Sequence, residues 1–402
     1  MSAVPKLRFP EFEGEWEVFS IGDLGQVITG STPSTKNNDF YGGDIPFFSP
    51  ADIPETPAAI SKSEKTLTSL GFAKTRRVRK GATLFVCIGS TIGKLAFSKT
   101  EGTTNQQINS VVPSDNHEDY FVFSALQRVR ERVRDLSATH AVPIINKSSF
   151  SSVTVLIPSL PEQQKIASFL SSIDKKIDLL RQKKDALALY KKGLMQKIFS
   201  QEIRFKQDDG SDFPDWEDMA LGDVLHEHKE KSAGQEPVFS VSVSKGLVNQ
   251  IEHLGRSFSA ADTGHYNKAK PHDVIYTKSP TGNFPLGIIK QSTVDFDVIV
   301  SPLYGVFTPE TAALGFILNV YFESEINVGN YLSPLVQKGA KNTIACTNKR
   351  FLEGKLKLPR SHTEQRKIAG LLAAIQKKIA VTSSQIEQME TFKKGLLQQM
   401  FV

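Results

Sequence analysis

Residues 162–199 read EQQKIASFLSSIDKKIDLLRQKKDALALYKKGLMQKIF, and residues 364–401 read EQRKIAGLLAAIQKKIAVTSSQIEQMETFKKGLLQQMF. The two stretches align without a gap, and the offset between them is half of the 402-residue chain. A repeat this long is not the short period of a solenoid. It indicates two copies of one unit, each made of a globular part followed by a long helix.

Apolar residues in both stretches recur in alternating steps of four and three, which is the heptad pattern of a coiled coil. Lys184, Lys191 and Lys393 occupy positions of this pattern, where a polar residue usually fixes register. We expect the two helices to pair antiparallel, since each begins at the end of its own globular part. The alternative is two unrelated surface helices. The predicted seam consists of Ile166, Leu170, Ile173, Ile177, Leu180, Leu187, Leu194, Ile198, Ile368, Leu372, Ile375, Ile379, Ile386, Met389, Leu396 and Met400.

Similar segments flank the two helices. A strand-like stretch that ends at proline precedes each helix, VTVLIPSLPEQ at 153–163 and GKLKLPRSHTEQ at 354–365. The two units also begin alike. Trp16 precedes Ile21-Gly22-Asp23-Leu24, and Trp216 precedes Leu221-Gly222-Asp223-Val224. The frame of the unit is therefore duplicated.

Between these marks the two globular parts differ, as expected if each recognises something different. Both combine short alternating apolar runs with helical stretches such as 119–136, so we predict two mixed α/β domains and an internal pseudo-two-fold repeat. The polar stretch 207–215 is the expected interdomain linker.

Composition sets broad limits on function. The formal net charge of +6 permits a polyanionic partner without requiring one. Cys87 and Cys346 have no metal-binding spacing, and they suit a reducing cytoplasm. We find no secretory leader and no apolar run of about 20 residues, so we expect neither export nor a membrane partner.

Two motifs resemble catalytic sites. Gly89-Ser90-Thr91-Ile92-Gly93-Lys94 is one residue short of a P-loop and lacks the hydroxyl after lysine, so a tight turn between strands fits better. Pro214-Asp215 with Glu227-His228-Lys229 resembles the active site of a metal-dependent nuclease. The first unit, however, has no counterpart of the Glu-His-Lys triad, so a chance resemblance is the better explanation. We expect His226 and His228 to face solvent. No catalytic or metal site is predicted.

The chain resembles the specificity subunits of type I restriction–modification systems. The resemblance is strongest at 158–199 and 359–401, and the IPFFSPADI stretch at 45–53 and GSTIGKLAF at 89–97 support it. It implies two target-recognition domains, separated by two helices conserved in that family. The pattern departs at His362-Thr363, where the first copy has Leu160-Pro161. The implied boundaries are 1–158, 159–200, 201–359 and 360–402.

In that family each target-recognition domain reads one half of a split, asymmetric site in double-stranded DNA. The helices set the spacing and dock two modification subunits, which carry S-adenosylmethionine and methylate adenine. Separate restriction subunits bind ATP and Mg²⁺, move DNA and cut it. The resemblance therefore implies a chain that is not an enzyme and binds no cofactor or metal of its own.

Polar side chains in the loops of each globular part are the predicted DNA contacts. Amides of Asn and Gln pair well with adenine, whereas Lys94 suits a phosphate. For each residue an ordinary loop-capping role is the alternative. The predicted contacts are Ser49, Asp52, Ser90, Thr91, Lys94, Asn105, Gln106, Gln107, Lys278, Ser279, Thr281, Asn283, Lys341 and Asn342.

Two other functions remain open at this stage. One is an enzyme with a divergent nuclease or methyltransferase site. The other is a coiled-coil scaffold without a nucleic-acid role. Neither the base sequence recognised nor the gap between half-sites follows from the sequence.

Overall fold

The computed structural model describes residues 4–137, 143–251, 263–278, 280–338 and 344–402. The chain forms two compact units. Unit 1 comprises residues 1–183 and 382–402, and unit 2 comprises residues 184–381. Each long helix therefore contributes one of its ends to each unit, so the compact units cross the predicted boundaries at 159–200 and 360–402.

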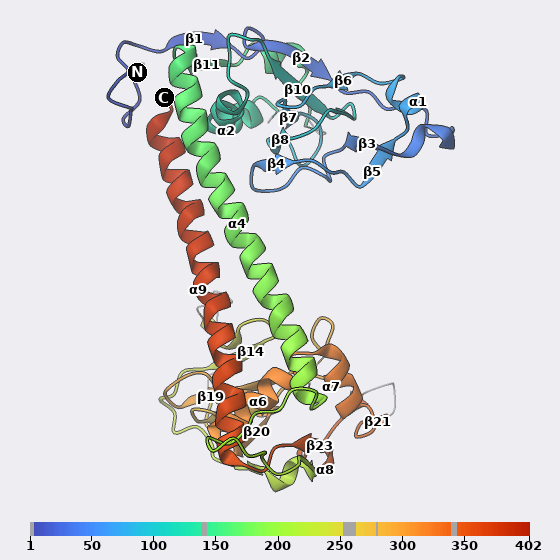
Figure 1. Ribbon diagram of the computed structural model, residues 1–402, viewed down its shortest axis with the longest axis vertical. Helices are drawn as coiled ribbons and strands as arrows, with labels where there is room; N and C mark the ends of the chain where they lie inside the picture. Colours follow the sequence, from blue (N-terminus) through green and yellow to red (C-terminus); the bar gives the residue numbers. More distant parts are fainter. Residues whose placement is uncertain (1–3, 138–142, 252–262, 279, 339–343) are drawn as a thin grey trace. The chain divides into compact units, whose positions relative to one another are not determined.

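The described part of unit 1 contains a five-stranded, a four-stranded and a two-stranded sheet, the last formed by β1 and β11, and helix α2 packs against the five-stranded sheet beside the start of α4 (Figure 1). The larger sheet has the strand order β2-β10-β7-β8-β4, and the smaller β5-β3-β9-β6. Its strands are β1 Glu17–Ser20, β2 Gly25–Thr29, β3 Tyr41–Phe48, β4 Ala58–Ile60, β5 Lys65–Leu67, β6 Arg77–Val78, β7 Thr83–Val86, β8 Leu95–Ser98, β9 Gly102–Thr104, β10 Ile108–Pro113 and β11 Thr154–Ile157. Its helices before α4 are η1 Asn38–Phe40, α1 Ser69–Phe72, α2 Asp119–Asp135 and α3 Lys147–Ser151.

Unit 2 has a four-stranded sheet of order β13-β20-β17-β18 and several two-stranded sheets. Its strands are β12 Glu217–Ala220, β13 Leu225–Glu227, β14 Phe239–Ser242, β15 Gly246–Asn249, β16 Asn267–Ala269, β17 Val274–Tyr276, β18 Ile289–Gln291, β19 Val298–Val300, β20 Gly305–Pro309, β21 Gln337–Lys338, β22 Ile344–Ala345 and β23 Lys355–Leu358. Its helices before α9 are η2 Leu221–Asp223, α6 Ala312–Tyr321, α7 Glu325–Leu332 and α8 Asn348–Glu353. The mixed α/β prediction is confirmed for both parts.

The repeated stretches form the long helices α4 Leu160–Phe199 and α9 His362–Met400. In unit 1 the start of α4 shares a core with the end of α9, where Ile173 lies in one cluster with Leu396. In unit 2 the end of α4 shares a core with the start of α9, where Leu194 lies with Leu372. The helices therefore pair antiparallel, as predicted.

The predicted seam positions lie on the packed side of both helices. Twelve of the sixteen are buried, and Leu180, Leu187, Ile379 and Met389 are half-buried. Lys393 is itself 8% exposed, and its ammonium lies 2.7 Å from a carboxylate oxygen of Asp174. The lysine in this seam is thus paired with an acid of the opposite helix.

A duplicated contact explains why both helices begin with Glu-Gln. Glu162 is 1% exposed, and it accepts two 2.8 Å hydrogen bonds from the Arg8 guanidinium and one of 3.3 Å from Trp16 Nε1. In unit 2 Arg204 Nη2 lies 3.3 Å from Glu364 Oε1, and Glu364 is equally buried. The buried carboxylate thus holds the segment that leads into each globular part against the helix.

The glutamine that follows connects the same helix to the globular part. Gln163 Nε2 donates to the Pro158 carbonyl at 2.9 Å, and its Oε1 accepts from the Glu118 amide that caps α2. Gln365 repeats this with the Pro359 carbonyl and with Thr311, the residue that caps α6. These bonds fix each helix start relative to its own domain.

The stretch 207–215, predicted as the interdomain linker, is held in place within unit 2. Arg204 donates to the carbonyls of Phe213 and Pro214, and Phe213 is buried. Lys367 of α9 pairs with Asp208 at 2.6 Å. An arginine outside the stretch therefore organises this linker.

Candidate nucleic-acid interface and partner surface

Two loops of unit 1 lie in close contact at the end of strand β2. The Ser31 amide donates to the Thr104 carbonyl at 2.9 Å, and the Gly30 amide donates to the Ile108 carbonyl at 3.0 Å. A Cβ on Gly30 would lie only 2.0 Å from the Asn105 carbonyl oxygen. Glycine is therefore required where the 30–34 loop approaches the 105–107 turn.

The three predicted amides of that turn have different surroundings. Asn105 Nδ2 donates to Gln107 Oε1 at 2.9 Å, and the backbone N–H of Gln107 donates to Asn105 Oδ1 at 3.1 Å. Gln107 Nε2 reaches the Ile88 carbonyl at 3.4 Å, so both half-buried side chains stabilise the turn. Gln106 is exposed, and its Oε1 accepts from Thr32 Oγ1 at 2.6 Å.

Ser49 and Asp52 are engaged in a local cap. The Ser49 amide and hydroxyl donate to Asp52 Oδ2 at 2.8 and 2.7 Å, and the Glu64 amide donates to Asp52 Oδ1. This is the loop-capping role that was the alternative to DNA contact.

The loop with Ser90, Thr91 and Lys94 forms the expected tight turn between β7 and β8, with Ser90 exposed. Lys94 pairs with Glu55, and its side chain is 18% exposed. A phosphate contact by Lys94 would have to replace this ion pair.

Sequence reasoning missed a basic segment, Lys74 to Lys80, which reads KTRRVRK. The backbone amide of Arg76 donates to Ser31 Oγ at 3.0 Å, and the Arg76 guanidinium donates to the Thr29 carbonyl at 2.8 Å. Lys74 and Lys80 are exposed and have no ion pair with the described residues. The run of five basic residues in seven was the available signal. It places positive charge beside the 30–34 loop.

Unit 2 presents fewer of its predicted contacts. Lys278 is half-buried and has a φ of 58°, and burial lowers the pKa of its ammonium. Thr281 and Asn283 are both exposed, and Asn283 donates to Glu325 at 2.8 Å. Ser279, Lys341 and Asn342 lie outside the described residues.

The nuclease-like residues of unit 2 have separate structural partners. Asp215 pairs with Arg204 at 3.0 Å, and Glu227 accepts from Asn348 at 2.6 Å. His228 Nε2 lies 2.8 Å from the buried Asp273 carboxylate, so the expectation that this histidine faces solvent was wrong. Among the described residues no group of three potential ligands could hold a metal ion.

A second candidate surface lies on the outward faces of the two helices. Tyr190 of α4 is 58% exposed, and its repeat equivalent Phe392 of α9 is 52% exposed. Three residues further on, a Cβ on Gly193 or Gly395 would have no atom within 4 Å. Glycine inside a helix costs about 1 kcal/mol relative to alanine. Each unit thus has one exposed aromatic ring followed by a glycine with open space beside its Cα. This arrangement suits close approach by another chain.

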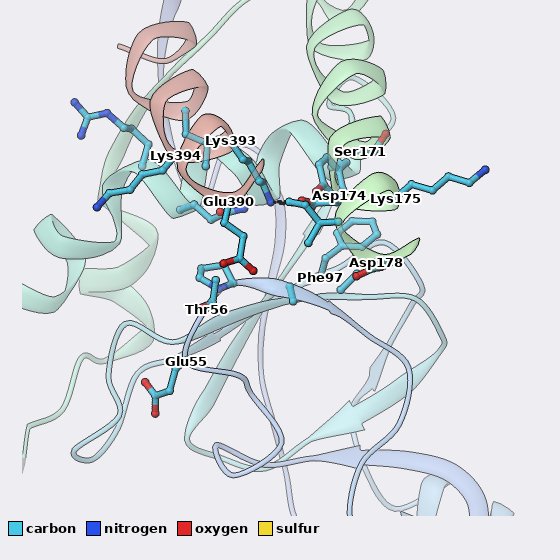
Figure 2. A pocket seen from close by; sticks show the side chains of 18 of the residues that line it. Glu55, Thr56, Phe97, Ser171, Asp174, Lys175, Asp178, Glu390, Lys393 and Lys394 are labelled. Carbon is cyan, nitrogen blue, oxygen red and sulfur yellow. Dashed lines mark hydrogen bonds and ion pairs between the residues drawn. The ribbon is translucent and has the colours of Figure 1, made fainter. Parts of the chain in front are cut away.

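A groove of about 1010 Å³ also lies within unit 1, between α2, residues 55–57 with the start of β4, α4 and α9. Figure 2 shows Lys393 of α9 directed at Asp174 of α4 on its wall. The Tyr120 hydroxyl donates to the same carboxylate, and burial raises the pKa of Tyr120. The buried polar groups of this wall thus bond to one another.

Comparison with known proteins shows which proteins the chain resembles. A family profile described as "Type I restriction modification DNA specificity domain" matches residues 13–189. The type I restriction enzyme MjaIX specificity subunit of Methanocaldococcus jannaschii is 30% identical over 60% of this chain and 58% of its own length. The MjaVIII specificity subunit of the same organism is 23% identical over 97% of this chain and 92% of its own. The chain is similar to the type I specificity subunits.

A solved structure of this family has the same fold along the whole chain. The type I restriction–modification S subunit from M. genitalium superimposes with a TM-score of 0.63, covers 99% of both chains and shares 14% sequence identity. No helix of the described residues is sufficiently long and apolar to cross a membrane.

Proposed function

We propose that this chain is a specificity subunit that reads a bipartite, asymmetric sequence in double-stranded DNA and assembles modification and restriction subunits on it. The single observation that carries the proposal is the duplicated frame around two different globular parts. The Arg8–Glu162 and Arg204–Glu364 contacts are repeated, whereas the sheets that they hold differ in strand order. Two different domains on one repeated frame suit two different half-sites.

The chain itself, under this proposal, contributes binding without chemistry. S-adenosylmethionine, ATP and Mg²⁺ belong to the partner subunits, and adenine is methylated by them. The buried, unpaired thiols of Cys87 and Cys346 suit the reducing cytoplasm, where we place the complex.

The phosphate-binding side of unit 1 is assigned to the exposed lysines of the 74–80 segment. Cationic side chains beside a base-reading loop fix the position of the protein on the duplex. In unit 2 we assign the corresponding role to the loop that contains Lys278 and Thr281.

Each exposed helical face is assigned to one modification subunit. Because Tyr190–Gly193 and Phe392–Gly395 are equivalent in the repeat, two copies of one partner can dock in the same way. The exposed rings supply apolar contact area, and the glycines permit close backbone approach.

Reconstitution tests the proposal. The pure chain with DNA, Mg²⁺ and S-adenosylmethionine is expected to neither cleave nor methylate DNA. Addition of modification subunits is expected to give adenine methylation at one split motif. Methyl transfer by the chain alone would favour an enzyme, and a complex that methylates without sequence preference would refute the recognition role.

Stoichiometry tests the docking surface. Tyr190→Asp and Phe392→Asp are each expected to reduce the bound modification subunits from two to one in native mass spectrometry. Gln182→Asp, at an exposed position of α4, is the control. Retention of two subunits by both variants would refute this assignment.

A further inference from the structure

The 105–107 turn of unit 1 offers one amide for recognition and uses two for its own structure. All four polar side-chain atoms of Asn105 and Gln107 are hydrogen-bonded to each other, to the turn backbone or to Ile88. Gln106 projects from the middle of the turn and is exposed. Its Nε2 has no hydrogen-bond partner among the described residues.

The orientation of this amide is fixed by Thr32. Thr32 Oγ1 donates to Gln106 Oε1 at 2.6 Å, so the oxygen faces the 30–34 loop. The carbonyl oxygen keeps a second lone pair, and Nε2 keeps both of its hydrogens. The amide can therefore accept one hydrogen bond and donate another on its exposed edge.

The loop that carries Thr32 is anchored by hydrogen bonds at both neighbouring residues, Ser31 and Pro33. The Ser31 amide donates to the Thr104 carbonyl at 2.9 Å, and the Tyr41 hydroxyl donates to the Pro33 carbonyl at 2.9 Å. Across the contact, the Ile108 amide closes the turn on the Asn105 carbonyl. The hydroxyl and the amide thus project from two anchored loops.

We infer that Gln106 reads an adenine in the major groove of the first half-site and that Thr32 is its positioning residue. Adenine offers the N6 amino group as donor and N7 as acceptor, which match Oε1 and Nε2 of the amide. This inference rests on the proposed function and adds which base is read and by which pair of residues. The basic 74–80 segment, bonded to the same loop through Ser31, supplies the adjacent phosphate contacts.

Motif analysis of the reconstituted complex tests this inference. Methylation of a library of sites in which each base of the motif is varied gives the discrimination at each position. Gln106→Ala is expected to lower discrimination at one A·T pair by roughly 5- to 150-fold, since a bidentate amide–adenine pair has that value. The other positions are expected to stay unchanged.

Three further variants separate reading from positioning. Thr32→Val is expected to lower discrimination at the same base pair by roughly 2- to 12-fold, the value of one hydrogen bond, whereas Thr32→Ser retains it. Gln107→Ala is expected to lower discrimination at the same base pair and also to weaken methylation of all sites, because its side-chain amide stabilises the turn that carries Gln106. The Thr32→Val effect is expected to vanish in a Gln106→Ala background.

If Gln106→Ala discriminates at every position as the wild type does, the inference is overturned. The proposed function would still stand in that case, provided that the wild-type complex methylates a split motif. A change at a G·C pair would overturn the adenine assignment. Equal discrimination by Thr32→Val and the wild type would overturn the positioning role. Absence of any split motif in the wild-type complex is the separate outcome that refutes the proposed function.

Discussion

Replacement of Glu162 by glutamine isolates the electrostatic part of the duplicated frame, because glutamine keeps the size and one acceptor oxygen. Removing one partner of a buried ion pair costs about 3–5 kcal/mol. Arg8 keeps hydrogen bonds to the Gly14 and Glu13 carbonyls and is 13% exposed, so we expect a loss of about 2–4 kcal/mol for unit 1. Glu364→Gln is expected to cost less, about 1–2 kcal/mol, because the bonds from Arg204 are 3.3 and 3.4 Å long.

The two tryptophans provide separate probes, since Trp16 lies beside Glu162 in unit 1 and Trp216 lies in unit 2. Urea unfolding followed by fluorescence in a Trp216→Phe background measures unit 1, and the Trp16→Phe background measures unit 2. Arg8→Met combined with Glu162→Gln is expected to show a coupling energy of at least about 1.5 kcal/mol. Additive effects, or a Glu162→Gln loss below about 0.5 kcal/mol, would refute the argument.

Four other variants test the helices and the DNA surface. Ile177→Asp buries an unpaired charge in the seam and is expected to cost at least about 3 kcal/mol in urea unfolding, whereas the exposed Ser172→Asp stays near wild type; equal stability would contradict the seam. Lys80→Ala is expected to lower the slope of log affinity against log salt by about one; an unchanged slope in Lys94→Ala would contradict the predicted phosphate contact of Lys94. Insertion of two heptads at Leu187 lengthens the helix by roughly 20 Å and is expected to change the gap between half-sites but not the bases read. An active variant with the original gap would show that the helices are not the spacer.

The sequence was sufficient for the features that repeat. The heptads of 162–199 and 364–401 predicted two paired helices, because apolar spacing determines which face is buried. The place of each helix at the end of its own globular part predicted that the pairing is antiparallel. The Glu-Gln pairs were visible as repeats, but their role was not, because Arg8 is far from Glu162 along the chain. The prediction that His228 faces solvent was wrong for the same reason, since its partner Asp273 lies 45 residues further along the chain, directly before β17.

The candidate site was less predictable than the fold. Polar residue type pointed to Asn105, Gln106 and Gln107 alike, and only the three-dimensional contacts separate the exposed amide from the two that stabilise the turn. Thr32 became relevant because the 30–34 loop packs on that turn. Asp52 has an equally suitable side chain, yet it is used to cap its own loop.

The central claim is that each globular part reads its own half of one DNA site. The most direct measurement is the methylated motif of a chimaera in which residues 1–158 are replaced by the matching part of a relative, determined by methylome sequencing of the host. We expect one half of the split motif to change while the other half and the gap stay the same. A change in both halves, or in neither, would contradict the claim.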